Sequence, residues 1–179
     1  WHKKLAEDET FDVQVLPAWR PDKAMNLEKP DYLDYLAKLE TASGMKIDSF
    51  AALIEALKNR MDFFAENGCT VSDHGLEYVM HVPATEEEVE KIFAKRLSGE
   101  TVSRQEELQF KTAYMTALGK EYHKRNWVMQ LHYGVKRDNN RRVFNELGPD
   151  AGIDCINNFA PSSEMADYLN GLAETDELP

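Results

Sequence analysis

The chain alternates three short apolar runs, each typical of a β-strand, with long stretches of helical pattern. The runs cover residues 11–16, 69–71 and 127–131, and each one ends in polar residues. Strands that alternate with helices are typical of a parallel α/β sheet, because two parallel strands need a long crossover connection. Functional side chains of such sheets gather at the carboxyl ends of the strands. We therefore expect a functional site at the three polar endings.

Helical signals fill the intervals between these runs. Apolar residues within 50–64 recur on one helix face, and Gly68 follows as a stop signal. Capping boxes that begin at Thr85 and Ser103 predict two further helices. Shorter helices are expected around 31–40 and 163–172, and Gly75–Met80 is a candidate start of another. The crossovers are longer than a parallel pair requires, so the extra helices are expected to form a layer beside the sheet.

The composition limits the class of protein. Of the 179 residues, 42% are hydrophobic and 30% are charged, which is typical of a globular domain. No apolar run approaches the roughly 20 residues that cross a bilayer, and no signal-peptide pattern occurs, so we expect a cytoplasmic protein without membrane contact. A net charge of −11 disfavours nucleic-acid binding. Cys69 and Cys155 lie far apart, outside any metal-binding spacing, and are expected to be reduced.

Both ends of the sequence predict that it belongs to something longer. Trp1–Leu5 has the pattern of a helix end, and a further strand would be expected after 175–179.

Arg20 is the first candidate, since it follows the first apolar run between Trp19 and Pro21. Its guanidinium could bind a carboxylate through two parallel hydrogen bonds. The alternative is a surface ion pair with Asp22.

The second ending, Ser72-Asp73-His74, also has two interpretations. Ser72 or Asp73 could be a helix N-cap, a role that both residue types favour. An Asp-His pair at the end of a strand could instead orient a proton-transfer group or approach a metal.

His132 ends the third run and precedes Tyr133-Gly134, where the strand must turn. An imidazole there could transfer a proton, polarise a carbonyl or bind metal, although single histidines are more often structural. The run Lys136–Arg142 holds four cations and follows directly. It predicts either a solvated helix start or a basic patch for an anionic substrate.

Four segments, taken together, resemble the uronate isomerase family, also called glucuronate isomerase. They occur in the family's order and at compatible spacing over essentially the whole chain: Val15–Lys23, Gly68–His74, Gln130–Gly134 with Arg137–Asn140, and Leu147–Asp154. The resemblance implies an α/β fold of the amidohydrolase superfamily, a distorted (β/α)8 TIM barrel. This chain would supply three parallel βα units with extra inserted helices and would be predominantly helical.

The implied reaction interconverts D-glucuronate with D-fructuronate, and D-galacturonate with D-tagaturonate, in hexuronate breakdown. A proton would move from C2 to C1, with an enediol as the intermediate. The resemblance also implies a divalent metal, with zinc the first choice, in the full-length enzyme. The family's His-x-His pair and last-strand Asp, which hold that metal, have no counterpart here, so we predict no metal ligand within this chain.

In the resemblance, Arg20 matches a substrate-contacting arginine, His132 matches a histidine that faces the active site, and Asp73 and His74 match a Ser-Asp-His segment. His132 and Asp73 are expected to be catalytic. The residues expected to bind the substrate are Arg20, Trp19, His74, Arg137 and Asn139.

Five consecutive segments follow from the strand and helix pattern within such a barrel. They are 1–23, a barrel strand with its active-site loop; 24–66, a helical insertion; 67–82, a second strand and loop; 83–125, a second helical insertion; and 126–179, a third strand with a basic loop and a helix.

Two other functions remain open from the residues alone. One is a metal-dependent hydrolase on the same barrel, and the other is a helix-rich binding module without catalysis. The expected partner is a uronate sugar, and a homo-oligomer is allowed.

Overall fold

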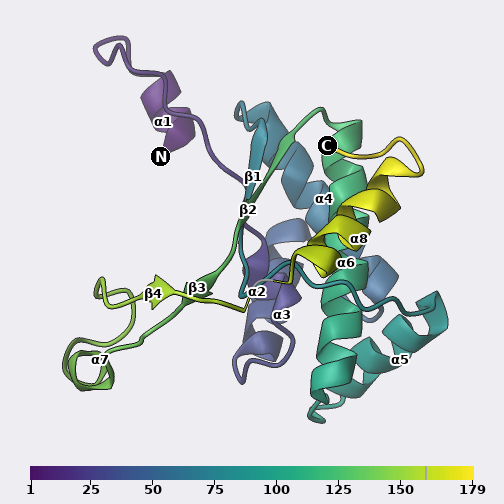
Figure 1. The fold of residues 1–179 in the computed structure, drawn as a ribbon. Helices are drawn as coiled ribbons and strands as arrows, with labels where there is room; N and C mark the ends of the chain where they lie inside the picture. Colours follow the sequence, from purple (N-terminus) through teal and green to yellow (C-terminus); the bar gives the residue numbers. More distant parts are fainter. Residues whose placement is uncertain (160) are drawn as a thin grey trace.

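A computed structural model describes residues 1–159 and 161–179 (Figure 1). Most of its regular structure is helical. The helices are α1 (His2–Ala6), α2 (Asp22–Met25), α3 (Tyr32–Ser43), α4 (Phe50–Glu66), α5 (Glu86–Leu97), α6 (Arg104–Lys124), α7 (Arg141–Leu147) and α8 (Ser162–Ala173). The strands are β1 (Val71–Gly75), β2 (Val128–His132), β3 (Val135–Lys136) and β4 (Cys155–Ile156).

The main sheet is parallel, as the alternating pattern predicts. β1 pairs with β2 in a register that places Val71 beside Val128 and Gly75 beside His132. On the other edge of β1, Trp19 forms a single parallel bridge with Ser72. β1 is therefore the middle of three parallel segments, and the three polar endings meet at one edge of the sheet.

The helical layer packs around α6. On α6, four fully buried residues recur at every fourth position and form one continuous stripe: Phe110, Tyr114, Leu118 and Tyr122. α8 lies close against this helix because Gly119 has no side chain, and a Cβ there would lie 2.8 Å from Leu172. Both predicted capping boxes are present and begin α5 and α6. In Figure 1 the larger helices α3–α6 and α8 lie on one side of β1 and β2.

Two local predictions are wrong. Residues 11–16 form no strand, and the parallel bridge occurs further along the chain, at Trp19. Phe11, Val13 and Leu16 are exposed, and no strand among the described residues pairs with this apolar run. Gly75–Met80 begins no helix, because β1 continues to Gly75 and an irregular segment follows. Ser72 and Asp73 are accordingly strand residues and not N-caps.

Residues 135–156 form a projecting arm that the sequence pattern does not predict. It consists of the antiparallel pair β3–β4 with α7 between them, and it extends away from the helical layer in Figure 1. The amide of Gly134 donates to the Glu77 carbonyl (3.1 Å), and the amide of Asn157 donates to the Gly134 carbonyl (2.8 Å). These hydrogen bonds join the base of the arm to the segment that follows β1.

Within residues 1–159 and 161–179, no helix has both the length and the apolar character needed to cross a membrane.

Candidate active site

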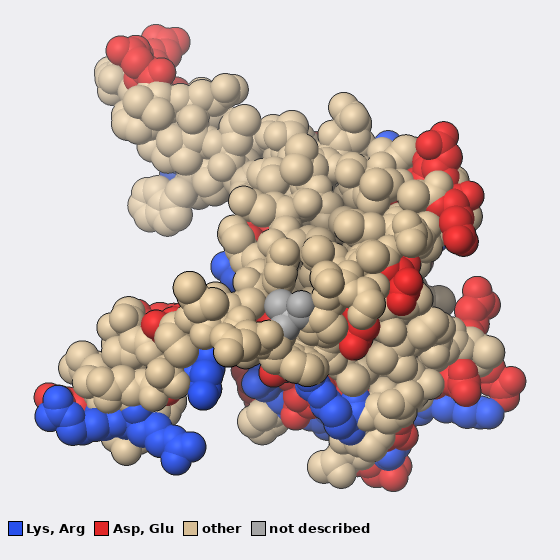
Figure 2. Space-filling view, viewed as in Figure 1, with Lys and Arg blue, Asp and Glu red and all other residues tan. Residues whose placement is uncertain are grey.

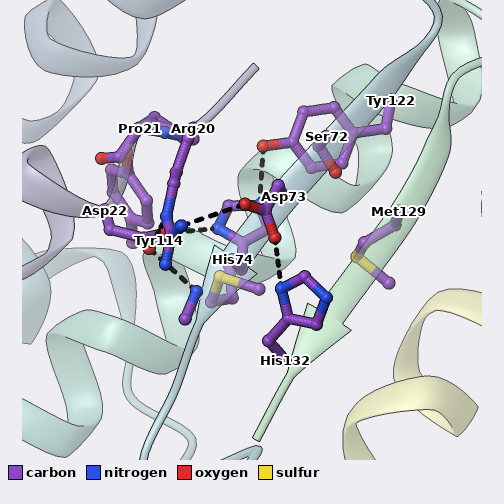
Figure 3. Close-up of polar contacts among 12 residues, drawn as sticks. Arg20, Pro21, Asp22, Ser72, Asp73, His74, Tyr114, Tyr122, Met129 and His132 are labelled. Carbon is purple, nitrogen blue, oxygen red and sulfur yellow. Dashed lines mark hydrogen bonds and ion pairs between the residues drawn. The ribbon is translucent and has the colours of Figure 1, made fainter. Parts of the chain in front are cut away.

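The two faces of β1 carry different groups. Ser72 and His74 are completely buried beneath the helices. Asp73 lies between them in the strand and points to the opposite face, because successive side chains alternate. His132 pairs in register with Gly75 and is therefore on the same face as Asp73. Figure 3 shows Arg20, Asp73 and His132 turned toward one another.

Arg20 is held between two carboxylates. Its Nε donates to Asp22 Oδ2 at 3.2 Å, and its Nη1 lies 3.1 Å from Asp73 Oδ2. The side chain is nevertheless 56% exposed. Since a guanidinium has five N–H donors, the remaining donors, including those on Nη2, can reach a ligand. Arg20 is thus both oriented and accessible.

His132 lies against the same Asp73. Its Nδ1 is 2.6 Å from Asp73 Oδ1, and its side chain is 58% exposed. A carboxylate that contacts one ring nitrogen fixes the orientation of the imidazole and leaves the other nitrogen free for proton transfer. The ion-pair contact places the His132 ring beside Asp73 at the exposed face.

Behind Arg20, a set of buried polar contacts joins Asp22, His74 and Tyr122. Asp22 Oδ1 is 2.9 Å from His74 Nδ1, and His74 Nε2 is 2.8 Å from the Tyr122 hydroxyl. Because a carboxylate only accepts, a hydrogen on Nδ1 and a lone pair on Nε2 would satisfy both contacts. Tyr122, His74, Asp22, Arg20, Asp73 and His132 form one continuous chain of polar contacts.

Burial and hydrogen bonding shift the pKa of the Asp22 carboxyl in opposite directions. Burial raises the pKa of its carboxyl, whereas the hydrogen bonds from His74 and from the Gly75 amide lower it, and the net pKa is below the ordinary value. Asp22 is therefore a carboxylate at neutral pH. Burial raises the pKa of Tyr122 well above its usual value, so its hydroxyl keeps a proton that can be donated to His74.

A pocket of about 750 Å³ opens beside these residues. Arg20, His132, Lys136 and Arg137 are among the residues that line it. Figure 2 shows Lys and Arg side chains gathered on the arm at the lower left. Both alternatives for the basic run are represented: α7 begins at Arg141, and Lys136 and Arg137 face the pocket.

Arg137 and Asn139 are placed differently within the arm. Arg137 forms ion pairs with Asp150 and with Asp154, the latter at 2.5 Å. Those two acids belong to the segment before β4, so the arginine also has a structural role in closing the arm. The backbone amide of Asn139 donates a hydrogen bond to the Ile153 carbonyl. Asn139 is not among the residues that line the pocket.

Trp19 and His74 lie behind the exposed face. Trp19 is 6% exposed and packs edge-on against Phe64, with ring centroids 4.9 Å apart. His74 is fully buried. Their burial favours a supporting role over the substrate contact that the resemblance implied.

Asp22, Gly75 and Tyr122 are the residues that the sequence interpretation did not place in the site. The sequence predicts Asp22 only as a surface partner of Arg20, yet its side chain is 14% exposed. Tyr122 belongs to an apolar helical stripe, and a hydroxyl at the end of that stripe was the only signal that it needs a polar partner. No sequence signal places Gly75 beside Arg20.

The described residues do not by themselves form a metal site. Within 1–159 and 161–179, no three side chains of His, Cys, Asp or Glu are grouped so that they could hold an ion. Asp73 and His132 are adjacent, but Asp73 also contacts Arg20, and a catalytic divalent ion usually takes about three protein ligands. A metal at this face would need ligands from elsewhere.

Known proteins match this chain over its whole length. The sequence profile described as glucuronate isomerase matches residues 1–179. The chain is 68% identical to uronate isomerase of Lachnoclostridium phytofermentans and 66% identical to that of Lachnospira eligens, in each case over 100% of this chain and 38% of the relative. It therefore spans 38% of the length of these curated relatives.

Solved structures agree with the sequence matches. The crystal structure of uronate isomerase from Thermotoga maritima superposes with a TM-score of 0.88 at 33% identity, covering 96% of this chain and 38% of that chain. The glucuronate isomerase from Caulobacter crescentus gives 0.84 at 25% identity, covering 96% and 35%. Because the family profile and these relatives align with the whole length of the chain, it belongs to the glucuronate isomerase family.

Proposed function

We propose that this chain is the part of a uronate isomerase that binds the substrate carboxylate and supplies one proton-transfer group. The observation that carries this proposal is the position of Arg20: it is held by Asp22 and Asp73 beside His132, with its remaining donors exposed. A uronate has a carboxylate at C6, far from the reacting carbons C1 and C2. Arg20 would bind the carboxylate and thereby fix the sugar's position.

The reaction moves a hydrogen within the sugar. A base removes the proton from C2 as O1 gains a proton, and the resulting enediol loses a proton from O2 as C1 is protonated. Such a reaction needs a group that accepts and returns protons, and a group that stabilises charge on the carbonyl oxygen. His132 is proposed for proton transfer. Asp73 would act through His132 by orienting its ring.

The remaining predicted site residues receive supporting roles. Trp19 and His74 are proposed to support the strand ends from the buried side. Arg137, with Lys136, would add positive charge to the pocket. Asn139 is proposed to help shape the loop between β3 and α7, where its backbone is bonded to Ile153.

The rest of the enzyme would complete the site. We propose that β1, β2 and the Trp19 segment are neighbouring parts of a distorted (β/α)8 barrel, with their helices outside and Arg20, Asp73 and His132 facing inward. A divalent metal, proposed to be zinc, would be held mainly by residues outside this chain. When bound, it would supply Lewis-acid stabilisation of a substrate oxygen.

The enzyme is proposed to act in the cytoplasm on D-glucuronate and D-galacturonate. Its test is a full-length uronate isomerase carrying this sequence, assayed for conversion of each uronate to its ketose. Amides and lactones assayed in parallel test the hydrolase alternative. Conversion of uronates with no hydrolysis is the expected result. Hydrolysis without isomerisation, or binding without any turnover, would contradict the proposal.

A further inference from the structure

We propose that Asp22 is the positioning residue that orients Arg20 toward the substrate carboxylate, and that Gly75 leaves the space in which the guanidinium lies. The inference rests on the proposed function, because it concerns how the same site recognises a carboxylate. It assigns a role to two residues that neither the sequence interpretation nor the family match placed in the site.

Asp22 contacts three donor groups, two at the end of β1 and one on Arg20. Its Oδ1 is 2.9 Å from His74 Nδ1, and its Oδ2 accepts from the Gly75 amide at 2.8 Å and from Arg20 Nε at 3.2 Å. One carboxylate therefore joins the end of β1 to the arginine. An Asn at this position would offer a single acceptor oxygen, and its NH₂ group would face at least one of the three donors.

The backbone on both sides of Asp22 is fixed by buried tyrosines. The Tyr114 hydroxyl donates to the Pro21 carbonyl at 3.0 Å, and the Tyr32 hydroxyl donates to the Ala24 carbonyl at 3.0 Å. Both tyrosine side chains are completely or almost completely buried. The carboxylate is thus attached to a rigid support, which makes it suitable for orienting a long, exposed side chain.

Gly75 is where the end of β1 approaches the guanidinium. A Cβ built on Gly75 would overlap Arg20 Nη2 and would lie 3.5 Å from Asp22 Oδ2. The end of an arginine can usually move aside, but here two carboxylates hold it. Any side chain at position 75 would therefore displace Arg20 from its place in the pocket.

The arrangement leaves the Nη2 group of Arg20 for a ligand. Asp22 and Asp73 use Nε and one hydrogen of Nη1, while the Nη2 hydrogens remain. The two carboxylates hold the guanidinium from both sides, through Nε and through Nη1, which favours binding of a third carboxylate at Nη2. Lys136 lines the same pocket and adds positive charge to it.

The test uses the full-length enzyme and two ligands that differ at C6. The KM for glucuronate reports binding of the carboxylate, and the Ki of glucuronamide as a competitive inhibitor reports binding of a neutral amide at the same place. Asp22→Asn is expected to raise the KM for glucuronate by about 10-fold or more, since a charged hydrogen bond is lost or misaligned. The Ki of glucuronamide is expected to stay unchanged.

Gly75→Ala is the second variant, because it moves Arg20 without altering the Asp22 carboxylate, and it should give the same selective loss. Matched controls are Asp34→Asn, at an exposed position of α3, and Gly171→Ala, where an added Cβ meets no atom within 4 Å. Both controls should leave the two constants unchanged.

Two results would overturn the inference. A merely structural defect would change the KM for glucuronate and the Ki of glucuronamide by the same factor, and an inert position would change neither. A wild-type enzyme that does not convert glucuronate would instead overturn the proposed function, and the inference with it.

Discussion

Asp73 Oδ1 lies 2.6 Å from His132 Nδ1, although the two residues belong to different strands. The contact exists because β1 and β2 are parallel and paired so that Gly75 is level with His132. Asp73 also contacts Arg20 through its other oxygen. One carboxylate therefore connects the proposed proton-transfer group to the proposed carboxylate-binding group.

Arg20→Lys in the full-length enzyme is expected to lower kcat/KM for glucuronate by about 10- to 100-fold, because a single ammonium cannot keep the separate contacts with Asp22 and Asp73 and also bind the substrate carboxylate. Steady-state kinetics measure the effect. Lys38→Arg, an exposed exchange of the same two residue types on α3, is the control. An unchanged kcat/KM for Arg20→Lys would remove Arg20 from the site.

His132→Gln is expected to lower kcat by about 100-fold or more, since a positioned acid or base contributes a factor of roughly 10² to 10⁴. The KM for glucuronate should change much less, because Arg20 still binds the carboxylate. His123→Gln, at an exposed position at the end of α6, should leave both constants unchanged. A His132→Gln enzyme with wild-type kcat would show that the proton-transfer group lies elsewhere.

Tyr122→Phe is expected to destabilise the folded protein by about 1–3 kcal/mol, because the buried His74 Nε2 loses its only hydrogen-bonding partner among the described residues. Thermal unfolding of the full-length enzyme measures this as a lower Tm. Tyr133→Phe removes a hydroxyl from a side chain that is 44% exposed, and its Tm should match the wild type. Equal Tm values for the two variants would show that the hydrogen bond between Tyr122 and His74 does not stabilise the folded protein.

The stability that Asp22 provides should depend on pH. Its pKa in the folded protein is below the ordinary value of about 3.9, so its contribution is present above that pH and is lost as the pH falls through the lowered pKa. The Tm difference between wild type and Asp22→Asn should therefore shrink as the pH is lowered below about 4. Asp34→Asn, at an exposed position of α3, is the control. A difference that grows on acidification would reverse the assigned sign.

Residues 1–179 produced alone are expected to be inactive and to bind no tight catalytic metal. The three parallel segments cannot close a barrel, and no metal site is formed within the described residues. Exposed apolar side chains on β2 and β4, such as Val128 and Ile156, predict self-association.

Turnover of glucuronate, metal content and light scattering test these expectations. The full-length enzyme is the positive control. Turnover by the isolated chain at about 1 per second or faster would place the whole catalytic set within it.

The sequence by itself determined the parts of the structure that depend on local patterns. The apolar stripe of 50–64 and the two capping boxes predict α4, α5 and α6, because a helix satisfies its hydrogen bonds and its end groups within a short stretch of chain. The polar strand endings also indicated where Arg20, Asp73 and His132 would meet. Four family segments in their proper order identified the family.

Only the tertiary structure decided which of the candidate site residues are buried behind the site and which are exposed in it. The run 11–16 has a strand-like pattern but no partner to pair with, and a strand needs hydrogen bonds from another segment. Asp22, His74 and Tyr122 come from α2, β1 and α6, and their contacts depend on how these elements pack. No local pattern specifies such a distance, because the residues in contact are separated by long stretches of chain.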